Sequence, residues 1–173
     1  GTAMAGNAVN MLYVLNGALP STCIPVAMAL FIASIILGST EGMVLSAILA
    51  SVLIAYYRFN RFPARVFTGD VGSLAVGSAI AAIAIIGRLE VIAVVAMIPF
   101  IMNSFHSLAS IGRLFERREV RLRPTFLQKD ERIAASTDPR SPLTLTRIIV
   151  GKVPLREYEV VKVLFVLSVC SSL

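Results

Sequence analysis

A polar and basic segment lies between two strongly apolar stretches of the chain, and it carries the residue types best suited to chemistry. The segment runs from Phe59 to Ser73 and includes Arg65, Phe67 and Asp70. Because a carboxylate at the edge of a bilayer is costly to desolvate, Asp70 needs a cation, a helix N-terminus or water as its partner. A divalent metal ion would satisfy it, and Arg65 with backbone N–H groups would complete a metal-phosphate site at the start of a helix. The simpler alternative is a capped helix whose first turn holds an acid. Phe67 offers either a flat ring beside such a site or an anchor at the membrane interface.

Three amides near the start of the chain form a second polar group. Asn7 and Asn10 lie one helical turn apart, and Asn16 follows close to the end of the same predicted helix. Amides inside a membrane helix must find partners, and one interpretation is hydrogen bonding between helices. The other is an amide oxygen on a hard cation and a second amide that binds a polar ligand, since carbonyl and carboxylate oxygens suit Mg²⁺. The residue types alone leave both interpretations open.

A long basic stretch between Arg113 and Pro124 forms the third group. It would bind anionic lipid head groups, nucleic acid or substrate phosphates, or it would only fix the orientation of the protein in the membrane. If the backbone is extended here, Arg121 and Arg123 lie on the same side and are able to hold two phosphoryl groups.

The composition indicates what kind of elements must position these residues. Hydrophobic residues make up 57% of the chain and charged residues only 15%, and the mean hydropathy is +0.82. Such a chain is typical of an integral membrane protein. Cys23 and Cys170 both lie inside apolar segments, so we interpret them as small buried hydrophobic residues.

We therefore expect an all-α fold, a polytopic bundle of transmembrane helices with a cytoplasmic loop excursion. The apolar windows, compared with the roughly 20 residues that span a bilayer, predict helices at Ala3–Leu15, Pro20–Gly38, Gly42–Tyr57, Val71–Gly87, Val91–Ser110 and Tyr158–Leu173. Residues 1–110 would form transmembrane helices with active-site loops, residues 111–157 a basic cytoplasmic loop region, and residues 158–173 a final helix. We expect the chain to be the C-terminal portion of a longer protein.

Counting the membrane crossings predicts which segments meet. The segments Asn16–Leu19, Arg58–Asp70 and Ile111–Glu157 fall on one face of the membrane, and that face carries most of the basic residues. By the positive-inside rule this face is cytoplasmic. The part from Thr125 to Leu155 is polar and rich in turn residues, and is expected to be a small cytoplasmic excursion.

These motifs resemble those of the polyprenyl-phosphate N-acetylhexosamine-1-phosphate transferases, which are multi-helix membrane enzymes. The resemblance rests on Gly6–Asn10, on Asn16-Gly17, on Phe62–Asp70 and on the order of the helices. The sequence Pro-Ala-Arg-Val-Phe is most similar to the corresponding motif of the eukaryotic and archaeal dolichyl-phosphate GlcNAc-1-phosphotransferase branch. The bacterial phospho-MurNAc-pentapeptide translocase is a weaker match, because its histidine-rich motif has no counterpart here; His106 is the only histidine.

The resemblance implies roles for individual residues. Asn10 and Asp70 would be the ligands of Mg²⁺, with Mn²⁺ as an alternative metal. Asn16 would hydrogen-bond the uracil, and Phe67 would stack on it. Where that branch has a glycine beneath the uracil, this chain has Val14. The family's paired aspartates and its lysine lie on earlier helices that this sequence does not contain.

The resemblance also assigns the pyrophosphate to Arg121 and Arg123. It implies transfer of N-acetylhexosamine-1-phosphate, with GlcNAc as the expected sugar, from a UDP-sugar to polyprenyl or dolichyl phosphate, with release of UMP. This is the first step of lipid-linked oligosaccharide assembly, and the site would face the cytoplasm in an archaeal plasma membrane or the endoplasmic reticulum.

The alternative is a non-catalytic membrane transporter or scaffold whose basic loop binds acidic lipid. Nucleic acid is not an expected partner, because no aromatic platforms alternate with the arginines. The sequence leaves open whether the protein forms a homodimer.

Overall fold

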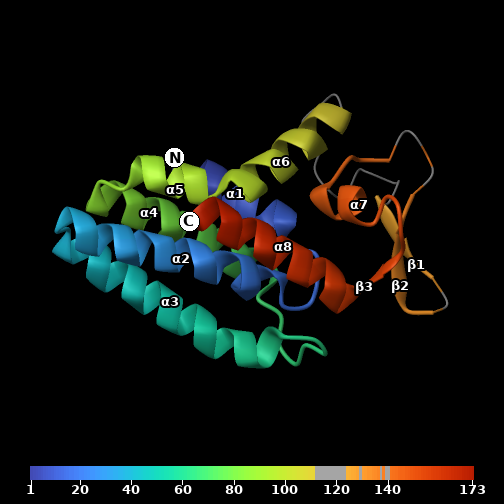
Figure 1. The fold of residues 1–173 in the computed structure, drawn as a ribbon, viewed down its shortest axis with the longest axis horizontal. Coiled ribbons are helices and arrows are strands. Elements are labelled where there is room, and N and C mark those ends of the chain that lie inside the picture. The colour runs from blue at the N-terminus through green and yellow to red at the C-terminus, as the bar shows by residue number, and fades with distance from the viewer. Residues whose placement is uncertain (112–123, 129, 137, 139–140) are drawn as a thin grey trace.

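The computed structural model describes residues 1–111, 124–128, 130–136, 138 and 141–173. Within these residues the chain forms helices and one small sheet, in this order: α1 (Thr2–Leu12), α2 (Ala18–Leu37), α3 (Thr40–Asn60), α4 (Gly69–Gly87), α5 (Glu90–Ala96), α6 (Ile98–Ile111), β1 (Thr125–Leu127), β2 (Arg132–Ala135), α7 (Leu145–Ile149), β3 (Leu155–Arg156) and α8 (Glu157–Ser172). The long helices lie side by side, and the sheet and α7 gather at one end, next to the start of α8 (Figure 1).

The helices confirm the predicted fold class of a mostly helical membrane protein. Helices α2, α3 and α4 are long and apolar enough to cross a membrane, and the bent pair of α5 and α6 would make a fourth span. Large apolar side chains remain on their surface, among them Ile36 at 77% exposed and Val71 at 83% exposed. Such a surface suits contact with lipid. Helices α1 and α8 also form as expected, but with 11 and 16 residues they are shorter than a typical span.

The predicted helix from Val91 to Ser110 is present but bent. The structure divides this stretch at Met97 into α5 and α6, whose axes differ by 63°. Pro99 follows the break at once. A proline inside a helix lacks the N–H that would bond to the preceding turn, and its ring collides with the carbonyl four residues earlier, so the helix bends there.

Helices α1 and α4 touch backbone to backbone. A Cβ atom added to Gly77 would lie 2.5 Å from the carbonyl oxygen of Ala5 and 2.7 Å from the Cα of Gly6. Only glycine fits at such a contact, and small residues let membrane helices approach this closely. The contact fixes the end of α1 beside the start of α4.

Helix α8 packs against α2. Val160 and Leu164 of α8 are buried in the same hydrophobic core as Leu19 and Val26 of α2. The buried hydroxyl of Ser168 donates a hydrogen bond of 2.6 Å to the carbonyl oxygen of Thr22. The last helix therefore closes back on the first half of the chain.

The polar stretch expected to be an excursion has more regular structure than the sequence indicated. Strands β1, β2 and β3 form an antiparallel sheet in that order, with Phe126 opposite Ala134 and Ile133 opposite Leu155. The strands have only three, four and two residues, too few for a pattern to show. Strand β3 continues directly into α8, so the sheet holds the start of that helix. Arg121 and Arg123 lie outside the described residues.

Candidate functional site

The first part of the site lies where α1 ends beside the start of α4. The buried hydroxyl of Ser73 donates to Oδ1 of Asn10 at 2.6 Å. Asp70 lies in the first turn of α4, three residues before Ser73, and is exposed. The structure thus brings Asn10 and Asp70 to the same end of two helices in contact, and a carboxylate in the first turn of a helix is favoured by the helix dipole.

The donor chemistry of this part fits a hard divalent cation. An amide oxygen has two lone pairs, so Oδ1 of Asn10 keeps one for a metal while it accepts from Ser73. Asp70 supplies an exposed carboxylate. Within the described part of the chain there is no group of three or more His, Cys, Asp or Glu side chains that would enclose a metal. Two oxygens are nevertheless enough to hold Mg²⁺, which usually keeps waters and substrate phosphates as its other ligands.

Asn60, the last residue of α3, joins two loops of the site. It is fully buried. Its Oδ1 accepts from the backbone N–H of Gly17 at 3.1 Å, and its Nδ2 donates to the carbonyl oxygen of Val66 at 2.8 Å. Gly17 follows Asn16, and Val66 precedes Phe67, so one side chain sets the spacing between the two residues expected to bind the base.

Asn60 was not among the predicted site residues, although it lies inside the polar segment. The usable signal is an amide at the end of an apolar helix, since a buried amide must be hydrogen-bonded. Arg65 and Phe67 are exposed, and 61% of the surface of Phe67 is accessible. The loop that carries Phe67 is held by two hydrogen bonds. The backbone N–H groups of Arg65 and Val66 both donate to the carbonyl oxygen of Phe59.

Asn16 makes contacts that the sequence did not indicate. Its backbone N–H donates to Oε1 of Glu157 at 2.6 Å, and its Nδ2 donates to Oε2 of the same carboxylate at 3.0 Å. The partners are 141 residues apart in sequence. Glu157 begins α8, and no motif pointed to it. The segments that carry Asn16, Asn60 and Glu157 meet at one end of the bundle, as the count of crossings predicted.

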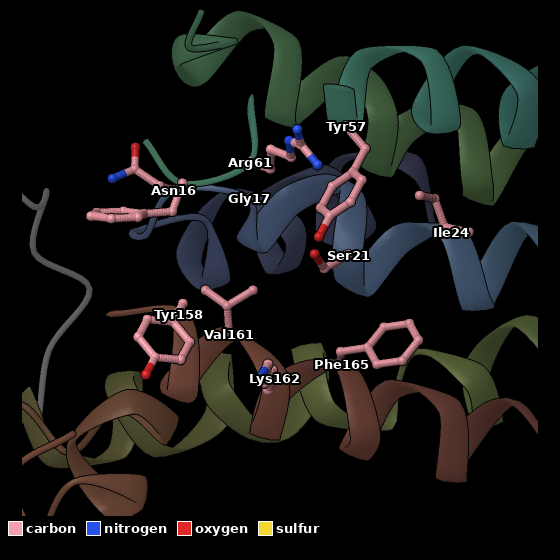
Figure 2. Close-up of a pocket in the computed structure, with 11 residues that line it drawn as sticks. Asn16, Gly17, Ser21, Ile24, Tyr57, Arg61, Tyr158, Val161, Lys162 and Phe165 are labelled. Atoms are coloured by element: carbon pink, nitrogen blue, oxygen red, sulfur yellow. The ribbon is translucent and has the colours of Figure 1, made fainter. Parts of the chain in front are cut away.

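A cavity of about 360 Å³ opens beside this junction, between α2, α3 and α8. Its lining includes Tyr57 of α3 and Arg61, which follows α3, together with Tyr158, Lys162 and Phe165 of α8 (Figure 2). The ammonium of Lys162 lies 5.3 Å from the centre of the Tyr158 ring, within range of a cation–π interaction. The cavity is therefore aromatic and basic.

A second groove, of about 420 Å³, is almost entirely apolar. It runs between α1, α4 and the bent pair of α5 and α6, and its lining includes Met4, Ala84, Met97, Ile101 and Phe105. The bend at Met97 makes room for it.

A bundle of membrane helices that gathers amides, a carboxylate and an exposed aromatic ring at one end defines a membrane protein with a polar site for a charged ligand. Residues 1–88 match the sequence profile of glycosyl transferase family 4, and the chain belongs to this family. The resemblance found in the sequence is confirmed at the level of the family.

Individual relatives agree with this assignment. The chain is 38% identical over 106 residues to a phospho-N-acetylmuramoyl-pentapeptide-transferase of Clostridium perfringens, a match that covers 61% of this chain and 33% of that protein. It is 30% identical over 173 residues to a putative glycosyltransferase of Methanocaldococcus jannaschii, which covers 98% of this chain and 54% of that protein. The chain thus spans about half the length of the archaeal relative and about a third of the bacterial one.

Proposed function

We propose that this chain is part of a membrane enzyme that transfers N-acetylhexosamine-1-phosphate from a UDP-sugar to a polyprenyl phosphate and releases UMP. The observation that carries the proposal is the junction of α1 and α4, where Asn10 bonds Ser73 one turn from Asp70. Membership of glycosyl transferase family 4 supports it.

The reaction is a phosphoryl transfer. An oxygen of the lipid phosphate attacks the β-phosphorus of the UDP-sugar, the bond from that phosphorus to the bridging oxygen breaks, and UMP leaves with the bond's electron pair. The attacking phosphate is already ionised at neutral pH, so no separate general base is required. Asn10 and Asp70 would hold Mg²⁺, or Mn²⁺ in its place. When bound, the metal ion would neutralise negative charge on the phosphoryl oxygens. Arg121 and Arg123 would hold the pyrophosphate by paired hydrogen bonds, with Arg65 nearby on the loop before Asp70.

The nucleotide base would lie between the two loops that Asn60 joins. The exposed ring of Phe67 is available for stacking, and Asn16 contributes its amide. The lipid acceptor has a separate place in this proposal. The apolar groove along α1, α4 and the bent helix pair suits a polyprenyl chain, because its lining offers almost no polar atoms.

The finer assignments are proposals as well. The sequence of Phe62–Phe67 favours the dolichyl-phosphate GlcNAc-1-phosphotransferase branch. For that branch the sugar donor would be UDP-GlcNAc, the pathway lipid-linked oligosaccharide assembly, and the site would lie on the cytoplasmic face. The named bacterial relatives are phospho-N-acetylmuramoyl-pentapeptide-transferases. An assay that compares UDP-GlcNAc with the UDP-linked N-acetylmuramoyl-pentapeptide, in the same membranes, distinguishes the two branches. A non-catalytic transporter or scaffold, the alternative, would transfer neither sugar.

The decisive test replaces the two proposed metal-binding residues in the full-length protein. Asp70→Asn and Asn10→Ala should each lower UMP release by at least about 100-fold, because transition-state charge is no longer neutralised. Turnover is measured across a Mg²⁺ titration. Asn7→Ala is the matched control, since Asn7 is exposed one turn earlier on α1 and should keep near-native turnover. Near-native turnover of Asp70→Asn at low Mg²⁺ would exclude the metal role.

A further inference from the structure

We propose that Glu157 is a positioning residue that fixes the amide of Asn16 in one orientation and thereby makes the site select uracil over cytosine. The proposal rests on the proposed function, and it adds a residue and a basis for nucleotide specificity that family membership does not supply.

The two hydrogen bonds define the orientation. Oε1 of Glu157 accepts from the backbone N–H of Asn16 at 2.6 Å, and Oε2 accepts from Nδ2 at 3.0 Å. An ionised carboxylate only accepts hydrogen bonds, so the NH₂ group of the amide must face it. A flipped amide would bring Oδ1 against Oε2, two acceptors with no proton between them. The carboxylate therefore determines which end of the amide points away.

The end that points away is Oδ1, and it is buried. Within the part of the chain that the structure describes, this atom has no hydrogen-bond partner. A buried acceptor without a partner is unfavourable and uncommon in a native protein. It indicates a ligand that donates a hydrogen bond at this point.

Uracil supplies such a donor and cytosine does not. The N3 atom of uracil carries a hydrogen, whereas N3 of cytosine is a bare acceptor. With the amide held by Glu157, uracil forms a hydrogen bond to Oδ1, and cytosine sets two acceptors against each other. A site that leaves a polar group unpaired rejects the wrong ligand far more strongly than one that only loses a contact.

Two consecutive backbone N–H groups of this loop donate hydrogen bonds to side chains, which keeps the Asn16 amide in place. The N–H of Asn16 donates to Glu157, and the next one, of Gly17, donates to Asn60. Glu157 is in turn placed by the sheet. Arg156, the residue before it, pairs with Arg132 in β2, and Leu155 pairs with Ile133. The small sheet would thus contribute to base selection through the start of α8.

The test compares Glu157→Gln with Glu159→Gln in the full-length protein. Glu159 is in the same first turn of α8, but its Oε2 accepts from the backbone N–H of Arg156 at 2.8 Å, within its own helix start. Binding of UMP and of CMP is measured by calorimetry in detergent, together with the melting temperature of each variant. A glutamine at 157 has both a donor and an acceptor, so the Asn16 amide is free to flip. We expect UMP binding to weaken about tenfold, the preference for UMP over CMP to fall by a similar factor, and KM for the UDP-sugar to rise more than kcat falls.

A second variant separates orientation from general loosening. In the double change Asn16→Asp with Glu157→Gln, the glutamine amide donates to one oxygen of the aspartate and the other oxygen again faces the base as an acceptor. Recovery of the UMP preference above that of Glu157→Gln alone would support the positioning role.

Three results would overturn the inference. They are equal behaviour of Glu157→Gln and Glu159→Gln, equal weakening of UMP and CMP, and no recovery in a double variant with a native melting temperature. If the unaltered protein prefers UMP but Glu157→Gln keeps that preference, only the inference fails. If the unaltered protein binds neither nucleotide, the proposed function fails with it.

Discussion

The two halves of the candidate site are built in different ways. Where α1 meets α4, the helices touch backbone to backbone at Gly6 and Gly77, and one short hydrogen bond joins Asn10 to Ser73. Where α2 meets α3 and α8, side chains do the joining, through Asn60 and Glu157, and a cavity of about 360 Å³ remains beside them. The first half is close-packed, and the second is polar and open.

The two halves should therefore tolerate different substitutions. A close-packed contact between backbones has no room for an added methyl group, so volume should decide its stability. A junction made by amides and a carboxylate has room for added volume, but breaking one of its buried hydrogen bonds leaves a polar group unpaired, so hydrogen bonding should decide. The first half suits rigid placement of a metal, and the second suits recognition of a base.

The largest expected effect comes from adding volume to the close-packed half. Gly77→Val would place Cβ only 2.5 Å from the carbonyl oxygen of Ala5. Because the obstacle is backbone rather than a flexible side chain, α1 and α4 must separate. We expect a loss of about 3 kcal/mol of stability, seen as a lower melting temperature in detergent, and loss of transfer activity.

Ala75→Val is the control for that change. Ala75 lies on the same helix but is exposed, so an added branch meets no backbone and should leave both measurements near native. If Gly77→Val melts at the native temperature, the backbone contact does not stabilise this half of the site.

A polar change in the open half should have the second largest effect. Asn60→Leu removes two hydrogen bonds and leaves the buried N–H of Gly17 without its partner, at a cost of about 1–3 kcal/mol. Since Asn60 sets the spacing of the loops that carry Asn16 and Phe67, KM for the UDP-sugar should rise about tenfold or more. Steady-state kinetics measure this.

Asn60→Asp tests hydrogen bonding with almost no change of volume. Aspartate still accepts from Gly17, but its second oxygen sets an acceptor against the carbonyl oxygen of Val66. Because this place is fully buried, Asn60→Asp should raise KM at least as much as Asn60→Leu, although it barely changes the volume of the side chain. If Asn60→Leu is as active as the native protein, volume rather than hydrogen bonding governs this half as well.

The sequence predicted the two halves unequally. The helices and the placement of Asn10 and Asp70 at adjacent helix ends followed from local signals, namely apolar windows of known length and polar residues at their ends. Ser73 lies one turn from Asp70, but its bond to Asn10 depends on a helix contact that only packing reveals. The bend before Pro99 was missed because the apolar window continues through it.

The open half depends on partners far apart in sequence. Glu157 and Asn16 are separated by 141 residues, and no single-sequence pattern joins an acid at the start of one helix to an amide before another. Hydropathy identified the helices but carries no information about which polar groups meet at their ends. The sequence shows an amide at the end of an apolar helix, but the two hydrogen-bond partners of Asn60 are determined by the fold.

The smallest expected effect comes from a polar change in the close-packed half. Ser73→Ala removes the donor to Asn10 at 2.6 Å but leaves the Gly6 and Gly77 contact in place. Asn10 then loses its fixed rotamer while α1 and α4 stay together, so stability should fall by only about 1 kcal/mol. The Mg²⁺ concentration for half-maximal transfer should rise a few-fold, because one proposed ligand is less well oriented. Ser51→Ala is the control, since Ser51 is exposed and its hydroxyl donates to the carbonyl oxygen of Ala47 in its own helix. A Mg²⁺ titration in which Ser73→Ala and Ser51→Ala coincide would show that packing alone orients Asn10, and a shift larger than that caused by Gly77→Val would reverse the order of effects that the comparison requires.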